Sequence, residues 1–306
     1  MLTPVMLFWL NEGDLRLVFQ GKSTLMEKIL VPTDFSENAR HALGVAATIA
    51  AKNASRLGLL HTNTAIAFAP VLPEYEFAGM YDMKEYYDRA ADEFRHLKKE
   101  LVAEPKFSKL EIDTRVEEGM LHASIRRVAE EDGADLVVMG TKGISGAAEF
   151  FVGSNTEKVI RTAPCPVLAV PEHSGDFNPK TVVLASTLTE EQSLAFSYLA
   201  LWQKMWPFKV KVLYLNNPRA FGSKREIDAM ASAMAERAGL EKVETFININ
   251  TFNEESTILE FARQENADLI VMATHQRRGL SHLLFGSLTE DAANHSSIPV
   301  LSVPLR

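Results

Sequence analysis

A glycine-rich segment holds the residues of this chain whose types and spacing best suit chemistry. It reads Gly140-Thr-Lys-Gly143 and continues, after nine further residues, with Gly153-Ser154-Asn155. The segment directly follows an apolar run, and its last glycine opens a helix-like stretch. Glycines let a backbone come close to a ligand, and the N–H groups at a helix N-terminus attract negative charge. The arrangement is typical of phosphate binding in α/β proteins.

Other interpretations of this segment stay open. Glycines such as Gly140 and Gly143 also form ordinary turns. Lys142 is placed to add positive charge, although a lysine in a loop is more often simply solvated. The start of the following helix favours phosphate binding, because the Ser154 hydroxyl and several backbone N–H groups can hold a phosphate together.

The elements that would position these residues are alternating strands and helices. Apolar strands separated by helices predict a parallel sheet covered on both faces. In such sheets ligands bind at the carboxyl ends of the strands, where the strand order reverses. The strands predicted in the amino-terminal half are Lys28–Pro32, Arg56–His61, Glu111–Val116, Leu136–Gly140 and Val167–Val170. The helices predicted there are Glu37–Lys52, Met83–Ala103, Leu121–Asp132 and Ser154–Thr162.

An internal repeat divides the chain into two halves. Residues 135–172 align without a gap on residues 268–305, and both segments contain Gly-Ser-x-Thr-Glu and Pro-Val-Leu-x-Val-Pro. The strands predicted in the second half are Thr181–Ala185, Val210–Leu215, Val243–Ile249, Leu269–Ala273 and Val300–Val303. We therefore predict a first domain over 26–172, a short linker, and a second domain over 180–306. Residues 1–25 are interpreted as an extension that is not part of the fold.

Composition excludes several classes of function. The chain has 306 residues and a formal net charge of -8. Nucleic acids and anionic membranes call for basic patches, so neither is expected as the main partner. Cys165 is the only cysteine, which excludes a disulfide framework and a cysteine-based zinc site and fits a reducing cytoplasm. We expect Cys165 to be a small buried apolar residue, and His61 to be packed rather than catalytic.

Four motifs, taken in order, resemble the universal stress protein family. They are Ile29-Leu-Val-Pro-Thr-Asp-Phe-Ser36, Ala134-Asp-Leu-Val-Val-Met-Gly140, the Gly-x2-Gly-x9-Gly-Ser spacing and Ala163-Pro-Cys-Pro-Val-Leu-Ala-Val170. The likeness covers nearly all of residues 26–306, as a tandem of two such domains. It implies an α/β fold of two doubly wound, parallel, five-stranded sheets, each ordered 3-2-1-4-5 and adenine-nucleotide alpha-hydrolase-like. That order would bring Asp34 and Gly140 together at the switch point.

The resemblance also implies an ATP site in the first domain, with or without Mg. Three residues would meet the adenosine, namely Pro32, Thr33 and Asp34. Met139 and Gly140 would flank it, and Thr62 is a looser match to a base-contacting main chain. The phosphates would be surrounded by Gly143, Gly153, Ser154 and Asn155, with Lys142 adding charge.

Asp34 has two candidate roles. A carboxylate facing a triphosphate would be repelled, so its expected role is to accept hydrogen bonds from the ribose hydroxyls or the adenine amine. The alternative is that Asp34 belongs to a helix-start cluster in which Ser36 is the N-cap. The family resemblance favours ligand contact.

The second half departs from the pattern. Thr187 stands at the position of Asp34, and Ala273 and Gln276 replace the two loop glycines. Threonine supplies no carboxylate, and a glutamine side chain would occupy space that phosphates need. We predict that the second half does not bind ATP and serves in packing or partner binding.

The leading functional hypothesis is an ATP-binding regulatory protein of the stress response, acting on an unknown protein partner. The alternatives are a slow ATPase and a nucleotide-free interaction scaffold. The apolar strand Pro166–Val170 would leave a hazardous edge if it were uncovered. This predicts either pairing between the two halves or a homo-oligomer such as a dimer.

Overall fold

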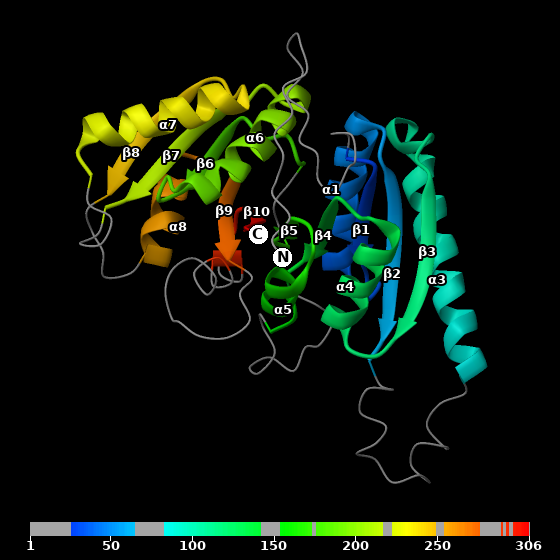
Figure 1. Ribbon diagram of the computed structural model, residues 1–306. Coiled ribbons are helices and arrows are strands. Elements are labelled where there is room, and N and C mark those ends of the chain that lie inside the picture. The colour runs from blue at the N-terminus through cyan, green and yellow to red at the C-terminus, as the bar shows by residue number, and fades with distance from the viewer. Residues whose placement is uncertain are drawn as a thin grey trace, which may run out of the picture.

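The computed structural model describes most of the chain as one ten-stranded sheet with helices on both faces (Figure 1). The described residues are 26–64, 83–141, 154–172, 176–216, 222–248, 254–275, 289, 292–293 and 296–305. The predicted extension, residues 1–25, lies outside them. No helix within these ranges is both long and apolar enough to cross a membrane.

The elements follow one another as alternating strands and helices in both halves. The first half contains β1 (Lys28–Pro32), α1 (Glu37–Asn53), β2 (Arg56–Asn63), α3 (Met83–Ala103), the 3-10 turn η2 (Pro105–Phe107), β3 (Ile112–Glu118), α4 (Leu121–Asp132), β4 (Leu136–Gly140), α5 (Ser154–Thr162) and β5 (Val167–Val170). The second half contains β6 (Thr181–Ala185), the 3-10 turn η3 (Glu190–Gln192), α6 (Ser193–Met205), β7 (Lys209–Leu215), α7 (Lys224–Ala238), β8 (Val243–Asn248), α8 (Glu254–Gln264), β9 (Leu269–His275) and β10 (Val300–Leu305). The predicted strands and helices therefore all form, with ends that differ by a few residues.

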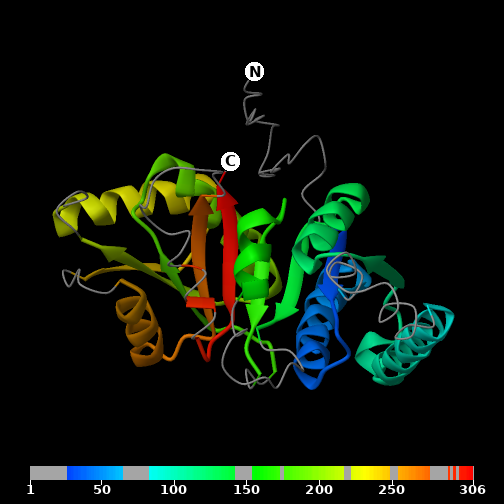
Figure 2. The ribbon, with the colours of Figure 1, turned by 90° about the horizontal axis from the view of Figure 1, so that it is seen from below.

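The strand order is β3-β2-β1-β4-β5-β10-β9-β6-β7-β8. Each half has the predicted order 3-2-1-4-5, and its strands pair in parallel. The halves join through an antiparallel pair in which Leu301 of β10 faces Leu168 of β5. Seen from below, β5 and β10 lie side by side in the middle of the molecule (Figure 2). The apolar edge of β5 is thus covered by the other half of the same chain.

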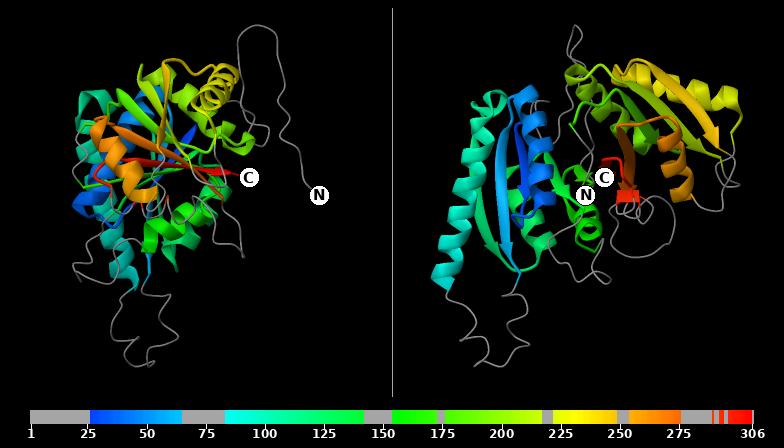
Figure 3. Two further views of the ribbon diagram at one scale, coloured as in Figure 1. Left: turned by 90° about the vertical axis from the view of Figure 1, so that its left-hand side faces the viewer. Right: turned by 180° about the vertical axis from the view of Figure 1, so that it is seen from behind.

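Helices cover the two faces of the sheet in two separate cores. Side chains of α1, α3, α6 and α7 pack on one face, and side chains of α4, α5 and α8 pack on the other. Successive strand residues alternate between these cores, as Ile29 and Leu30 do, because side chains of a strand point to opposite faces in turn. Helices α3 and α7 lie toward opposite outer ends of the molecule (Figure 3). Cys165 is buried, as predicted.

A repeated aspartate fastens the first strand of each half. Asp135 Oδ2 accepts hydrogen bonds from the backbone N–H groups of Glu27 and Lys28, at 2.7 and 3.1 Å. Asp268 Oδ2 accepts equivalent bonds from Lys180 and Thr181 at 2.8 and 2.9 Å. The shared Asp of the repeat therefore holds the start of β1 or β6 beside the start of β4 or β9.

Helices also contact each other across the junction of the two halves. Lys52, in the last turn of α1, places its Nζ 5.3 Å from the centroid of the Trp206 ring and 3.5 Å from the Met205 carbonyl oxygen. Phe177, in the linker, packs edge-on against Trp206 at a centroid distance of 5.5 Å. The linker and α1 are therefore both anchored on the end of α6.

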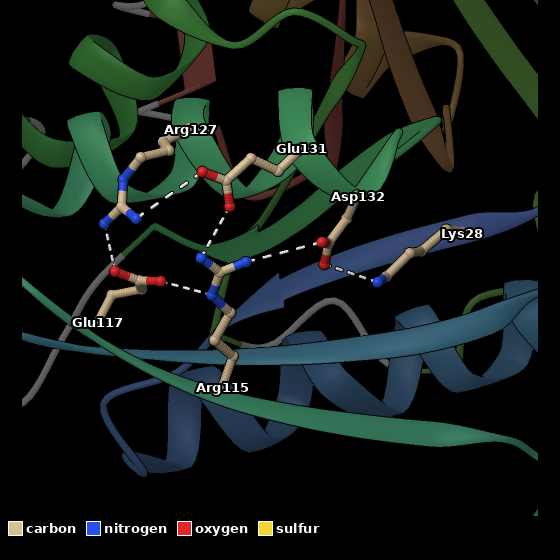
Figure 4. A network of polar contacts seen from close by, with 6 residues as sticks. All are labelled: Lys28, Arg115, Glu117, Arg127, Glu131 and Asp132. Carbon is tan, nitrogen blue, oxygen red and sulfur yellow. Dashed lines mark hydrogen bonds and ion pairs between the residues drawn. The ribbon is translucent and has the colours of Figure 1, made fainter.

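An ion-pair network fastens α4 to the strands of the first half (Figure 4). Its members are Lys28, Arg115, Glu117, Arg127, Glu131 and Asp132. Arg115 on β3 pairs with Glu117 and, at 2.8 Å, with Glu131. Asp132 Oδ2 forms an ion pair with Lys28 Nζ at 2.7 Å. Glu117 also pairs with Arg127, so two guanidinium groups share one nearly buried carboxylate.

Candidate functional site

The candidate site lies where the carboxyl ends of β1 and β4 diverge. The two strands pair at Ile29–Leu136 and Leu30–Val137. Beyond their ends, Thr33 N donates to the Leu60 carbonyl of β2 at 2.8 Å, and Thr141 N donates to the Val170 carbonyl of β5 at 3.1 Å. The segment after β1 thus stays bonded to β2, the segment after β4 stays bonded to β5, and the two segments separate. This divergence is the switch point at which ligands bind in doubly wound sheets.

The loop between β1 and α1 forms a tight turn that includes Asp34. Phe35 N donates to Thr33 Oγ1 at 3.0 Å, and Ser36 N donates to Asp34 Oδ1 at 3.0 Å. Ser36 then caps α1 by accepting a hydrogen bond from Ala39 N at 3.1 Å. Phe35 has a φ of 65°, a conformation that non-glycine residues rarely adopt. Asp34 belongs to the helix-start turn, and its side chain is exposed.

Gly140 has a packing role that the sequence did not reveal. A Cβ added to Gly140 would lie 2.9 Å from the carbonyl oxygen and 3.1 Å from the carbonyl carbon of Asn38, in the first turn of α1. These are backbone atoms, so the clash could be relieved only by moving the helix. The glycine therefore allows α1 to start directly against the end of β4.

Three residues of the predicted adenosine site share the face covered by α4 and α5. Met139 is buried in that core together with Leu30 and Leu60. Thr62 follows Leu60 by two residues in β2 and Pro32 follows Leu30 by two in β1, so both lie on the same face. Thr62 is 9% exposed, and its Oγ1 finds no hydrogen-bond partner among the residues that the structure describes.

The predicted phosphate-binding residues are described only in part. Ser154 is the first residue of α5, and Asn155 is its exposed second residue. Lys142, Gly143 and Gly153 lie outside the described residues. The helix start that the sequence predicted is therefore present, after the chain leaves the end of β4.

A lysine near this helix start changes the titration of a histidine. His122 lies in the first turn of α4, and Lys158 lies in α5, which packs on α4. Burial lowers the pKa of His122, and the positive charge of Lys158 lowers it further. Both effects favour the neutral imidazole of His122.

His61 makes contacts that sequence reasoning missed. Its Nδ1 lies 2.8 Å from the Thr33 carbonyl oxygen, and its Nε2 lies 2.7 Å from the Tyr86 hydroxyl of α3. Its ring lies 4.6 Å from the Phe35 ring, centroid to centroid. The expectation that His61 is packed is confirmed, but the side chain also forms two polar bonds. The partners are 28 and 25 residues away in the chain, so no local pattern identifies them.

The matching loop of the second half has the same backbone turn, but a different side chain bonds to it. Leu188 has a φ of 55°, and its N donates to Ser186 Oγ at 3.0 Å, as Phe35 N does to Thr33 Oγ1. Gln192 is buried, and its Oε1 accepts hydrogen bonds from Ser186 Oγ at 2.7 Å and from Thr187 N at 2.8 Å. The Gln192 side chain thus satisfies the hydrogen-bond donors at the tip of this loop.

Other positions of the second half also differ from the first. Strand pairing places Ala185 opposite Leu213, as it places Pro32 opposite Leu60, so the residues after these partners correspond. Tyr214 therefore stands at the position of His61, and the buried Leu215 stands at the position of Thr62. Gln276, the predicted obstacle, lies outside the described residues.

Comparisons with known proteins agree with this architecture. The model of the universal stress protein family matches residues 26–171 and again residues 180–304. A universal stress protein of Thermus aquaticus is 33% identical over 148 residues, which are 48% of this chain and 99% of that protein. One of Methanocaldococcus jannaschii is 29% identical over 160 residues, 48% of this chain and 96% of that protein.

A solved structure covers both halves at once. The crystal structure of a universal stress protein from Archaeoglobus fulgidus superposes with a TM-score of 0.70 at 18% identity, over 94% of this chain and 99% of that one. At this identity the likeness concerns the fold. The two matches to the family model together span most of the sequence. The chain therefore belongs to the universal stress protein family, as a tandem of two such units.

Proposed function

We propose that the protein is a nucleotide-binding regulator of the stress response that binds one ATP, in the first of two domains. The first domain comprises residues 26–172, and the second, residues 180–306, has lost the site. ATP would occupy the switch point between β1 and β4, with or without Mg, and the adenosine would lie toward β2.

The observation that carries this proposal is the buried hydroxyl of Thr62. A buried polar group without a hydrogen bond costs about 1–3 kcal/mol, so each one calls for an explanation, and for Thr62 we propose a bound molecule. Thr62 lies on the same face as Pro32 and Met139, beside the switch point. The second half has Leu215 at this position and so needs no partner there.

The remaining residues of the proposed site would have the following roles. Asp34 would accept hydrogen bonds from the ribose hydroxyls, because it lies just after the end of β1 and its side chain is exposed. Thr33 and Gly140 would line the nucleotide with backbone atoms. The phosphates would bind at the start of α5, where N–H groups and the helix dipole attract anions. This group comprises Lys142, Gly143, Gly153, Ser154 and Asn155.

A regulatory role requires that ATP favour one arrangement of the molecule over another. The shared sheet supports such coupling, because β4 and β9 are separated only by the β5–β10 pair. A partner protein would then recognise the arrangement that ATP favours. Slow hydrolysis remains the alternative, and it predicts steady turnover that is lost when Gly143 is replaced.

The first test is to identify and count the ligand. Mass spectrometry of small molecules released from freshly purified protein should detect an adenine nucleotide. Calorimetric titration with ATP, ADP, AMP and cAMP, each with and without Mg, should give one site per chain. cAMP is included because one solved universal stress protein, 23% identical over 48% of this chain with a TM-score of 0.34, is a complex with cAMP. Two equivalent sites, or none, would contradict the proposal.

A further inference from the structure

We infer that His61 is a positioning residue that couples the nucleotide loop to the start of helix α3. The inference rests on the proposed function, since it concerns what the same loop does when ATP binds. His61 bridges the Thr33 carbonyl, in the loop after β1, and the Tyr86 hydroxyl, in the first turn of α3. It is the one imidazole shared by these two elements within the described part of the chain.

The two hydrogen bonds select one tautomer of the imidazole. A carbonyl oxygen can only accept a hydrogen bond, so the Nδ1 that faces Thr33 carries the proton. In the neutral ring Nε2 is then an acceptor, and the Tyr86 O–H donates to it. A displacement of the Thr33 carbonyl therefore changes the orientation of the ring that Tyr86 holds.

The bond to Thr33 controls the backbone at the proposed site. Described peptide bonds are trans, so the Asp34 N–H points away from the Thr33 carbonyl that His61 holds. His61 thereby sets the orientation of the Thr33–Asp34 peptide. The next residue, Phe35, has a φ of 65° and packs between His61, at 4.6 Å, and Phe94 of α3, at 5.3 Å. The uncommon backbone conformation is therefore supported by the same ring and the same helix.

On the other side, the start of α3 is tied to the ends of two strands. Tyr86 bonds to His61, two residues before the end of β2, and the Tyr87 hydroxyl bonds to Glu118, the last residue of β3. The rings of Tyr86 and His61 are stacked at 5.8 Å. A change at Thr33 can thus reach the first turn of α3 through a single side chain.

The second half provides an internal contrast. Tyr214 replaces His61, and a phenol has one hydroxyl in place of two ring nitrogens. Helix α7, the counterpart of α3, begins with a capping box between Ser223 and Glu226 that holds its first turn locally. In addition, Gln192 holds the amide of Thr187, which corresponds to the amide of Asp34. An imidazole with one ring nitrogen bonded to each of two elements is therefore not repeated at Tyr214.

Three variants separate the two bonds of His61. Tyr86→Phe keeps the stacked ring and removes only the hydroxyl that Nε2 accepts from. His61→Asn keeps an amide donor for the Thr33 carbonyl but does not reach Tyr86. His61→Leu removes both bonds. Nitrogen NMR of the imidazole in the full-length, ligand-free protein tests the tautomer, and hydrogen exchange over residues 83–90 with and without ATP tests the coupling.

We expect a protonated Nδ1 and an unprotonated Nε2 in the ligand-free protein, and an ATP-dependent change in exchange over residues 83–90. Tyr86→Phe should abolish that change and alter ATP affinity by less than about threefold, whereas His61→Leu should weaken binding about tenfold. His61→Asn should recover most of the affinity but not the change in α3.

The outcomes distinguish this inference from the proposed function. If the wild-type protein binds no nucleotide, the proposed function fails and the coupling falls with it. If it binds ATP but Tyr86→Phe keeps the full exchange response, or if the imidazole carries its proton on Nε2, only the role of His61 is overturned. Equal affinities of the Leu and Asn variants would likewise overturn it.

Discussion

The loops after β1 and β6 share a backbone and differ in what fills them. Phe35 and Leu188 both have positive φ values, 65° and 55°, and each N–H bonds to the hydroxyl two residues before it at 3.0 Å. The position of the first half that corresponds to residue 192 holds Ala39, which has no polar side chain. In the second half it holds Gln192, whose oxygen binds the loop itself. The two loops therefore share a backbone shape and differ in the side chain that bonds to the loop tip.

The helix that follows each loop differs as well. Helix α1 starts at Glu37, and its first turn lies against Gly140 so closely that a side chain there would clash with Asn38. The second half places the 3-10 turn η3 before α6 and has Ala273 at the position of Gly140. The first half thus combines a helix start packed against Gly140 with Asp34 at the loop tip. The second half combines a 3-10 turn before its helix with a loop tip that is bonded to Gln192.

The largest expected effect comes from giving the first half the residue of the second. Asp34→Thr removes the carboxylate, and a hydrogen bond to a charged group contributes about 1.5–3 kcal/mol, so ATP affinity should fall roughly 10–100-fold. Isothermal titration calorimetry with ATP measures this loss of affinity.

The reverse exchange, Thr187→Asp, is the matched control. It should create no second ATP site, because Gln192 still holds the amide of residue 187. A second site in that variant, or unchanged ATP affinity in Asp34→Thr, would show that this residue does not account for the difference between the halves.

Removing the glutamine should destabilise the second half. Gln192→Leu leaves the Ser186 hydroxyl and the Thr187 amide without their acceptor, and a buried donor left unpaired costs about 1–3 kcal/mol. Denaturant unfolding should show this loss, and ATP affinity of the first half should stay the same. Gln264→Leu, the same change at an exposed position of α8, should alter stability by less than about 0.5 kcal/mol. Equal effects of the two changes would contradict this role for Gln192.

Thr62→Val should separate stability from binding. The hydroxyl has no partner among the described residues, so its removal should leave the free energy of unfolding equal or higher in the absence of ligand. Loss of one neutral hydrogen bond should weaken ATP binding by about 2–10-fold.

The mirror variant, Leu215→Thr, should destabilise the protein by about 1–3 kcal/mol, since it buries a hydroxyl in an apolar core. Chemical unfolding of both variants, with and without ATP, measures the contrast. A large loss of ligand-free stability in Thr62→Val would mean that the hydroxyl has a structural partner.

The smallest effect concerns two tyrosines, one in each half. A hydrogen bond to Glu118, followed by burial, raises the pKa of Tyr87 from 10.0 to about 12. Burial alone raises the pKa of Tyr214. Glu118→Gln should therefore lower the pKa of Tyr87 and leave that of Tyr214 unchanged, as followed by phenolate absorbance.

The sign for stability follows from the raised pKa. The neutral phenol of Tyr87 is favoured in the folded state, so its contribution is complete below pH 10.0 and is lost as the pH rises toward about 12. Glu118→Gln should reduce this alkaline loss. A Tyr87 pKa that does not respond to Glu118→Gln would contradict the assigned hydrogen bond.

Much of the fold was predictable because it depends on local patterns. Apolar runs such as Leu136–Met139 and the spacing of helix residues indicate strands and helices directly. The repeat then predicted two copies, and the family resemblance predicted the strand order that both halves adopt. The turn chemistry of Ser36, whose hydroxyl caps α1, was also visible in the sequence.

The candidate site was predictable only in outline. The strand order implied by the family resemblance placed Asp34 and Gly140 together. Comparison of the two halves showed that Thr187 and Ala273 depart from the pattern. The sequence did not reveal that Gln192 fills the second loop, because glutamine at a helix start is ordinarily solvent-exposed. It assigned Gly140 to ligand contact, which stays a prediction, and did not reveal that the backbone of α1 lies close to this glycine.

By itself, then, the amino-acid sequence determined the identity and order of the elements, the duplication, and the loss of a carboxylate from the second copy. Tertiary structure alone decided that β5 pairs with β10, that His61 joins Thr33 to Tyr86, and that Thr62 is buried without a described partner. The physical reason is range. Periodicity and capping act between residues a few positions apart, whereas strand pairing and side-chain hydrogen bonds depend on where distant segments meet.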